Sequence, residues 1–192
     1  MAEGTAHRIA VIGSPGGGKS TLATALARAA GVPLIHLDRI YWAPGWEAPD
    51  DAAWRASNAT IVAGEEWVID GNYSSTLGDR LARATLVIWL DLPTVACLAG
   101  VLRRSFHYRR GGRPDMMDDC PERLDRAYLT FLHDVATFRR RQRVGLVRAL
   151  AASRVPVVHL ASTAARRTFL RNVDAECAHG IARLASSRIE MP

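Results

Sequence analysis

The sequence predicts an α/β fold in which helices flank a five-stranded parallel sheet. Five short apolar segments rich in Val, Ile and Leu lead to this prediction: Arg8–Ile12, Leu34–Leu37, Trp67–Ile69, Thr85–Leu90 and Val155–Leu160. None of them alternates polar and apolar residues, which is typical of strands buried on both faces of a parallel sheet. Segments with helical patterns lie between them, and this alternation of strand and helix requires crossover connections.

The helical patterns differ in strength along the chain. Lys19–Ala30 is rich in alanine and leucine, and Pro93–Arg104 has a proline suited to a first helical turn. Two later stripes follow a spacing of three and four residues, first Leu124, Tyr128, Phe131, Val135 and Phe138, then Phe169, Val173, Cys177, Ile181 and Leu184. We expect Asp38–Trp46 and Arg109–Cys120 to be irregular inserts at the ends of strands, where α/β folds carry their chemistry.

The length and composition fit one globular domain over residues 1–192. The three cysteines are far apart and form no Cys-x-x-Cys pair, which argues against a disulfide framework and a zinc site. The first expected strand begins at Arg8, and the longest apolar run, Leu86–Leu90, is too short to cross a bilayer. We therefore expect a soluble, cytoplasmic protein that does not insert into a membrane.

The basic residues are distributed unevenly, and 24 of the 25 are arginine; the one lysine is Lys19. Residues 1–102 have a net charge of −3, whereas residues 103–143 have +5 and residues 144–192 have +4. A basic second half indicates a site for an anion, either small phosphates or a nucleic-acid backbone. For most of these arginines, a solvated surface is the simpler explanation.

A glycine-rich phosphate loop follows the first expected strand. The segment Gly13–Ser20 fits Gly-x-x-x-x-Gly-Lys-Ser, with a strand before it and a helix after it. Its backbone N–H groups and the helix N-terminus are suited to bind phosphates, Lys19 reaches the β- and γ-phosphates, and Ser20 is a Mg²⁺ ligand. The expected ATP-binding residues are Gly13, Ser14, Pro15, Gly16, Gly17, Gly18, Lys19, Ser20 and Thr21.

The residues after the other strands favour phosphoryl transfer over hydrolysis. Neither Asp70 nor Asp91, at the two candidate strand ends, is followed by the glutamate that many hydrolysing ATPases use to activate water. The chain has no Asn-Lys-x-Asp motif, and no Asp-x-x-Gly follows a strand, which disfavours a GTPase. Transfer to a bound acceptor mainly requires positioning and cations, and residues 103–143 contain 11 arginines.

The phosphate loop, the strand end Val68–Gly71 and the arginine-rich segment resemble the adenylate kinase-like family of nucleoside and nucleotide kinases. The chain is more closely similar to a group of bacterial proteins within that family, the DNA topology modulation proteins. This similarity spans about residues 8–175 and rests on the segments Leu37–Trp42, Pro44–Trp46, Ile69–Tyr73 and Arg113–Met116. It implies the P-loop kinase fold with a short arginine-rich lid, here residues 104–126, and an acceptor-binding insert, here residues 38–66.

The resemblance also implies roles for single residues. Asp70 would bind Mg²⁺ directly or through water together with Ser20, although a turn or helix cap is an alternative role. Asp38 would bind the acceptor or act as general base, unless it caps a helix or pairs with Arg39. We expect an acceptor wall of Trp42, Trp46 and Tyr73, for which burial in the core is the alternative. The full set of expected acceptor residues is Asp38, Arg39, Trp42, Trp46, Gly71, Asn72 and Tyr73.

Four arginines are the expected phosphate contacts that act with Lys19 and Asp38 in catalysis: Arg104, Arg109, Arg113 and Arg139. Arg139 is preferred to Arg140 because neighbours on a helix diverge by about 100°. Asn72-Tyr73 stands where adenylate kinases have Phe-Pro-Arg, which places AMP as acceptor in doubt. His107, His133 and His159 lack ligand spacing and are expected to be satisfied or on the surface.

Three functions remain open from the sequence. The leading one is an ATP- and Mg²⁺-dependent kinase acting on a nucleoside, a nucleotide or a related metabolite. The second is a nucleotide-dependent protein that binds DNA or regulates its topology, which is less favoured because no helix-turn-helix or stacking platform is evident. The third is a degenerate kinase without an acceptor, against which the presence of Lys19, Ser20 and two strand-end aspartates argues.

Overall fold

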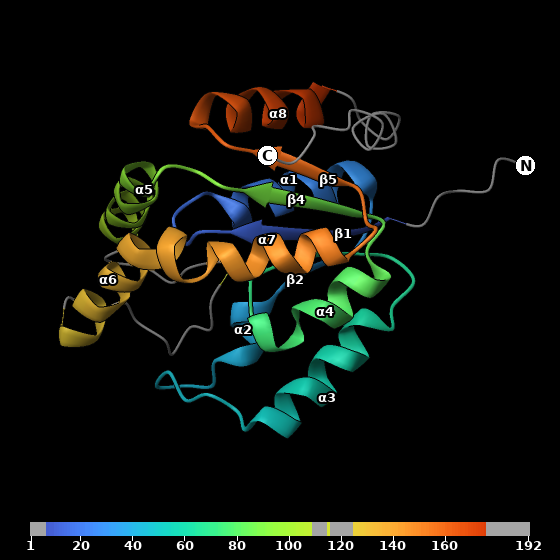
Figure 1. The fold of residues 1–192 in the computed structure, drawn as a ribbon, viewed down its shortest axis with the longest axis horizontal. Coiled ribbons are helices and arrows are strands. Elements are labelled where there is room, and N and C mark those ends of the chain that lie inside the picture. Colours follow the sequence, from blue (N-terminus) through green and yellow to red (C-terminus); the bar gives the residue numbers. More distant parts are fainter. Residues whose placement is uncertain (1–6, 109–114, 116–124, 176–192) are drawn as a thin grey trace, which may run out of the picture.

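A computed structural model describes residues 7–108, 115 and 125–175. It contains one sheet in the order β2-β3-β1-β4-β5, in which every paired strand is parallel (Figure 1). The strands are β1 Arg8–Gly13, β2 Leu34–His36, β3 Trp67–Asp70, β4 Leu86–Leu90 and β5 Val157–Leu160. All five predicted strands are present, and the predicted fold class is confirmed.

The strand register brings the ends of the three central strands together. Val11 of β1 pairs with Asp70 at the end of β3, and Gly13 of β1 pairs with Leu90 at the end of β4. The arrows of β1, β4 and β5 in Figure 1 point toward the side of the molecule that holds helices α5 and α6. The segments that follow Gly13, Asp70 and Leu90 therefore begin at one edge of the sheet.

Eight helices connect the strands in the described part of the chain. They are α1 Lys19–Ala30, α2 Leu37–Tyr41, α3 Asp51–Val62, α4 Ser74–Arg83, α5 Thr94–His107, α6 Arg126–Arg141, α7 Arg143–Ala152 and α8 Thr163–Ala175. Helix α1 has the predicted bounds. Helix α5 begins one residue later than predicted, because Pro93 is its N-cap and not part of its first turn. Helices α6 and α8 contain the other predicted helical segments as far as the described residues reach. Leu124, Cys177, Ile181 and Leu184 of the predicted stripes lie outside those residues.

The expectation of an irregular insert over Asp38–Trp46 is wrong at its start. Residues Leu37–Tyr41 form helix α2, and only the remainder is non-helical, with an isolated antiparallel bridge between Ala43 and Glu47. Strand β2 ends at His36, so Asp38 lies inside the helix rather than at the end of the strand. The helix was missed because five residues are too few to show a helical period.

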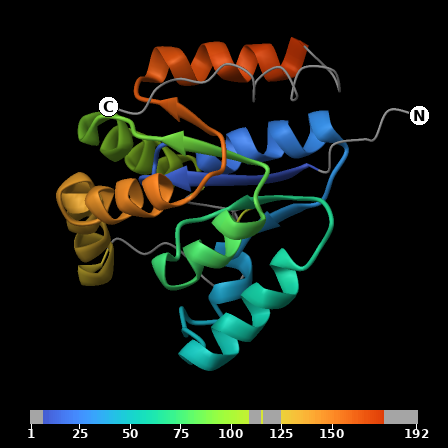
Figure 2. The ribbon, with the colours of Figure 1, turned by 45° about the vertical axis from the view of Figure 1, so that its right-hand side comes forward.

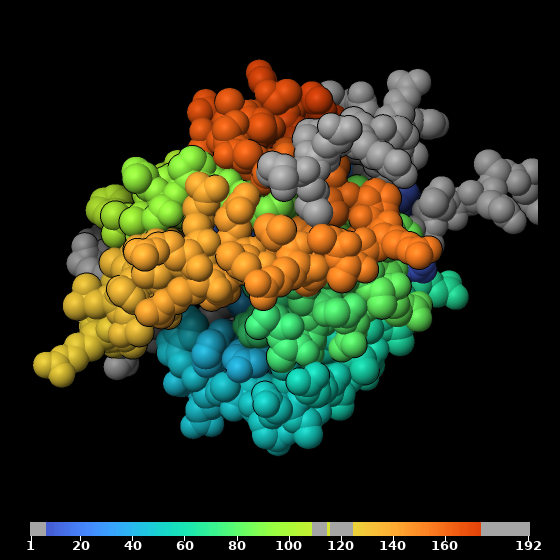
Figure 3. All heavy atoms as spheres, viewed as in Figure 1, coloured from blue at the N-terminus to red at the C-terminus, as the bar shows by residue number. Residues whose placement is uncertain are grey.

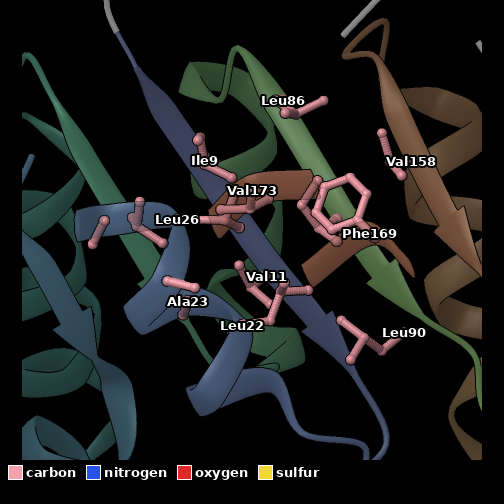
Figure 4. Close-up of a cluster of buried hydrophobic side chains, with 14 of the residues drawn as sticks. Ile9, Val11, Leu22, Ala23, Leu26, Leu86, Leu90, Val158, Phe169 and Val173 are labelled. Carbon is pink, nitrogen blue, oxygen red and sulfur yellow. The ribbon is translucent and has the colours of Figure 1, made fainter. Parts of the chain in front are cut away.

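Two apolar clusters cover the two faces of the sheet. On one face, helices α1 and α8 pack against β1, β4 and β5; Figure 4 shows Leu22 and Leu26 of α1 and Phe169 and Val173 of α8 over the strands. On the other face, α3, α4 and α7 contribute Trp54, Leu77, Leu81, Leu146 and Leu150. Figure 2 shows α8 on one side of the sheet and α3 and α4 on the other.

A third apolar cluster joins α5 to α6 beyond the edge of the sheet. It contains Leu92, Cys97, Val101, Tyr128 and Val135, so most of the predicted stripe on α6 faces α5, whereas Phe138 belongs to the cluster with α3, α4 and α7. Helices α6 and α7 form a continuous yellow-to-orange band across the face shown in Figure 3. In the described part of the chain, no helix is both long enough and apolar enough to cross a membrane.

Candidate active site

The phosphate loop runs from the end of β1 at Gly13 to the first residue of α1, Lys19. Gly16 and Gly18 have φ angles of +76° and +88°, a left-handed region that disfavours side chains. The carbonyl oxygen of Ser14 accepts hydrogen bonds from the N–H of Gly17 at 3.1 Å and from the Lys19 ammonium at 3.3 Å. The loop is therefore curled, with its lysine folded back over it.

Helix α5 packs directly on the phosphate loop through two glycines. A Cβ on Gly16 would collide with the carbonyl oxygen of Cys97, and a Cβ on Gly100 would collide with the carbonyl oxygen of Gly16. The backbone of α5 thus lies against the backbone of the loop. Gly100 was not among the residues expected from the sequence, where its only signal is a glycine inside an otherwise helical pattern.

Arg166, in the first turns of α8, also reaches the phosphate loop. Its Nη1 donates a hydrogen bond to the carbonyl oxygen of Gly17 at 2.9 Å, and its guanidinium fills the space beside Gly18. Burial lowers the pKa of Arg166, and the nearby positive charges of Arg103 and Arg167 lower it further. Arg103 and Arg166 both line the pocket above the loop, which places concentrated positive charge there.

Asp70, at the end of β3, is buried beside the loop with 6% of its surface exposed. His36 at the end of β2 lies 3.1 Å from its Oδ2 through Nδ1, while no described group donates a hydrogen bond to Oδ1. A buried carboxylate oxygen without a donor is suited to a cation or a cation-bound water. The turn or cap role left open for Asp70 finds no support in these contacts.

Ser20, the other expected Mg²⁺ ligand, donates a hydrogen bond from its hydroxyl to Asp115 Oδ2 at 2.9 Å. Among the described residues, no group of three or more His, Cys, Asp or Glu side chains gathers as a metal site. A hydroxyl and one or two carboxylates fit Mg²⁺, which keeps several waters and binds substrate phosphates. Ser20 and Asp70 are the residues that would hold it.

Asp38 opens into the same pocket from helix α2. The Tyr73 hydroxyl donates a hydrogen bond to Asp38 Oδ1 at 2.7 Å. Burial, followed by the negative charge of Asp38, raises the pKa of Tyr73 well above its usual range. The N-cap position of α2 is His36, so Asp38 does not cap this helix.

The three expected wall aromatics all line the pocket. The rings of Trp42 and Trp46 meet edge to face with centroids 5.5 Å apart, and Tyr41 packs between Trp42 and Tyr73. Trp46 is 38% exposed and Trp42 is half-buried, whereas Trp54, which contacts Tyr41 and Tyr73, is fully buried in the core. The core alternative therefore does not apply to Trp42 and Trp46.

Asn72 ties the turn after β3 to the phosphate loop. Its side-chain oxygen accepts from the N–H of Gly13 at 2.9 Å, and its amide nitrogen donates to the carbonyl oxygen of Gly13 at 2.8 Å. The side chain thus pairs with Gly13 as a neighbouring strand would. Asn72 was expected to contact the acceptor; in the structure both polar atoms of its side chain are bonded to Gly13.

The pocket brings together most of the residues expected from the sequence. The lining includes Pro15, Gly16, Gly18, Lys19, Ser20, Thr21, Asp38, Trp42, Trp46, Asp70, Gly71, Asn72, Tyr73 and Arg104. Gly13, Ser14 and Gly17 belong to the loop without lining the pocket, and Arg39 does not line it either. The expected phosphate contacts Arg109 and Arg113 lie outside the described residues.

The structure does not bring Arg139 into this pocket. The carboxylate of Asp91 is contacted by three side chains: Arg139 Nε at 3.4 Å, Arg143 Nε at 2.8 Å and His159 Nε2 at 3.2 Å. His159 also stacks on Trp89 with ring centroids 4.3 Å apart. His159 is therefore a satisfied histidine, as expected, and the exposed His133 fits the surface expectation.

Arg104 is the expected phosphate contact that does reach the pocket. It lies on α5, and its guanidinium carbon stands 5.9 Å from the centre of the Phe131 ring. His107, one turn further along α5, is exposed at the pocket rim. Helix α5 therefore lines one side of the pocket with Gly100, Arg103, Arg104 and His107.

Solved structures of small-molecule kinases share this fold. Shikimate kinase from Acinetobacter baumannii in complex with shikimate matches with a TM-score of 0.55 and 16% identity, covering 95% of this chain and 94% of that one. A gluconokinase from Sinorhizobium meliloti matches with a TM-score of 0.51 and 20% identity, covering 95% of each chain. No protein-family model and no curated protein matches the sequence. The five-stranded α/β fold of the P-loop kinases is thus established.

Proposed function

We propose that this protein is an ATP-dependent phosphotransferase that moves the γ-phosphoryl group of ATP to a nucleoside, a nucleotide or a related small metabolite. The observation that best supports this is the shared pocket of Lys19 and Asp38. A cation at the phosphate loop and an open carboxylate across the pocket are what transfer to a bound acceptor requires.

On the nucleotide side, the phosphate loop holds the triphosphate with its backbone N–H groups and Lys19. Arg103, Arg104 and Arg166 surround the same space with positive charge. Ser20 and Asp70 would hold Mg²⁺, and the bound ion would supply positive charge against the phosphates. The arginines bind and orient the phosphates, and they exclude water from one side of the pocket.

On the acceptor side, a flat ring stacks against Trp42 and Trp46 while a hydroxyl group points to Asp38. The Asp38 carboxylate takes the proton of that hydroxyl while the acceptor's hydroxyl oxygen forms a bond to the γ-phosphorus. The bond from the γ-phosphorus to the bridging oxygen breaks at the same time, and ADP leaves with that oxygen. An acceptor phosphate, which is already ionised, needs no proton removed.

We also propose that the insert 38–66 binds the acceptor and that the lid 104–126 covers ATP. The insert 38–66 contains most of α2, the segment 42–46 and α3, and it supplies Trp42 and Trp46 of the acceptor wall. The lid 104–126 lies mostly outside the described residues. The DNA-binding alternative is supported by no observation on the described residues, whose arginines Arg103, Arg104 and Arg166 line the same pocket as the phosphate loop.

An acceptor screen tests the proposal. ADP release from Mg-ATP is measured with nucleosides, nucleotides, sugars and small hydroxy acids, for the wild type and for Asp38→Asn. We expect stimulation by nucleosides or nucleotides that Asp38→Asn abolishes for hydroxyl acceptors. ADP release that no acceptor changes would point to an ATPase instead. Steeply salt-dependent binding of a labelled DNA duplex would favour the DNA alternative.

A further inference from the structure

Arg80, on helix α4, is a fully buried arginine with 0% of its surface exposed. The oxygens that it contacts are neutral: Nη1 donates to Asn58 Oδ1 at 3.1 Å and to Thr76 Oγ1 at 2.8 Å. Burial lowers the pKa of Arg80 to about 10, and the negative charge of Asp79 opposes this change. A buried charge of this kind is costly, and an apolar side chain of similar volume often serves stability better.

The other end of the Arg80 guanidinium holds the turn between β3 and α4. Nη2 donates to the backbone carbonyl oxygens of Asn72 and Tyr73, the latter at 3.2 Å. Tyr73 has a φ angle of +37° and lies in the left-handed region, which side chains such as tyrosine rarely adopt. The turn therefore has an unfavourable backbone conformation. The two Arg80 hydrogen bonds hold it together with those that the Thr76 N–H and hydroxyl donate to the Tyr73 carbonyl oxygen, at 3.0 and 3.3 Å.

This turn connects the two halves of the pocket. Asn72 pairs with both backbone groups of Gly13 at the start of the phosphate loop, and Tyr73 donates its hydroxyl to Asp38. Arg80 itself does not line the pocket. Its two backbone contacts nevertheless fall on the same two residues, Asn72 and Tyr73, whose side chains make these links.

We propose that Arg80 is a positioning residue that sets Asp38 relative to the phosphate loop. It fixes the 71–73 turn, and the turn fixes Asp38 through the Tyr73 hydroxyl and Gly13 through the Asn72 side chain. The inference rests on the proposed function in one respect, the assignment of Asp38 to the acceptor. It explains why a charged side chain occupies a fully buried position.

NMR of protein labelled with ¹³Cζ-tyrosine tests this without ATP or an acceptor. The Tyr73 signal is assigned with Tyr73→Phe, and Asp38→Ala, which has no acceptor, gives the position of that signal when the hydrogen bond is lost. We expect Arg80→Met to move the Tyr73 signal most of the way to its Asp38→Ala position. Arg80→Lys, which keeps a cation and fewer donors, should give an intermediate position.

Arg83→Met is the matched control, because Arg83 is an exposed arginine on the same helix. It should leave the Tyr73 signal at its wild-type position, and the Tyr128 signal should not move in any variant. A folded Arg80→Met protein with a wild-type Tyr73 signal would overturn the inference. If Arg80→Met fails to fold, Arg80→Lys decides: a displaced Tyr73 signal supports the inference, and an unchanged one overturns it.

The outcome is independent of the acceptor screen. A displaced Tyr73 signal together with no acceptor stimulation would leave the Arg80 linkage standing and count against the proposed function alone. Acceptor-dependent transfer together with an unchanged Tyr73 signal would support the proposed function and overturn the Arg80 linkage.

Discussion

Arg166 donates a hydrogen bond to the carbonyl oxygen of Gly17, 149 residues earlier in the chain. Through this bond, the last helix of the described residues supports the phosphate loop near the point where α1 begins. Arg103 on α5 faces the same pocket, and its positive charge helps to lower the pKa of Arg166. Two cations held close together favour the binding of an anion, because the anion relieves their mutual repulsion.

Replacing Arg166 with methionine should therefore weaken binding of a fluorescent ATP analogue by about tenfold, the loss expected for one charge-assisted hydrogen bond. The measurement is a fluorescence titration at fixed ionic strength. Arg167→Met is the control, since Arg167 is the exposed neighbour on the same helix. Equal affinities of the two variants would contradict a direct role for Arg166.

Lys19→Ala should lower phosphoryl transfer by about 10²–10³-fold, because it removes the compact cation at the phosphate loop. The free energy of unfolding should change by less than about 1 kcal/mol, since the side chain is only partly buried. ADP release with the acceptor from the screen and urea unfolding check the two statements. Full transfer in a folded variant would refute the role of Lys19 in the transfer step.

Gly100→Ala should lower the free energy of unfolding by about 1–3 kcal/mol and weaken nucleotide binding, because its Cβ would collide with the carbonyl oxygen of Gly16. Gly145→Ala is the matched control on α7, where a Cβ meets nothing within 4 Å. That change should raise the free energy of unfolding by up to about 1 kcal/mol through helix propensity. Urea unfolding and nucleotide titration of both variants measure the contrast.

Tyr73→Phe should flatten the loss of stability at alkaline pH. The pKa of Tyr73 is raised in the folded state, so above about pH 10 the unfolded chain loses a proton that the folded protein keeps. The contribution of Tyr73 to the free energy of unfolding is thus complete below about pH 10. Above that pH the contribution falls by up to about 1.4 kcal/mol per pH unit. Urea unfolding of wild type and variant from about pH 8 to about pH 11 tests this, and identical slopes would contradict it.

The sheet was predictable because its strands are short runs of uniformly apolar residues, and the glycine-rich loop because its spacing is specific. Helix α4 was not predicted, although Leu77 and Leu81 stand four residues apart on its buried face, which they share with Thr76 and Arg80. Helix α3 was missed as well, although Asp50 caps it by accepting from the N–H of Ala53 at 2.7 Å.

Contacts that depend on tertiary packing were beyond the sequence. Arg166 is one of 24 arginines, and nothing in its local pattern indicates that it reaches Gly17. The same composition made Arg139 a reasonable phosphate contact, whereas the structure places it on Asp91. His36 was missed because its partner Asp70 becomes a neighbour only when β2 pairs with β3.

The one lysine of the chain lies in the pocket, with its ammonium 3.3 Å from the carbonyl oxygen of Ser14. Reagents that acylate primary amines consequently have a single side-chain target in the whole sequence. Protection of that amine can be followed by the mass of the proteolytic peptide that contains Lys19 as nucleotides are added. Because every other basic side chain of the Lys/Arg type is arginine, the extent of lysine acylation measures how far nucleotide occupies the phosphate loop.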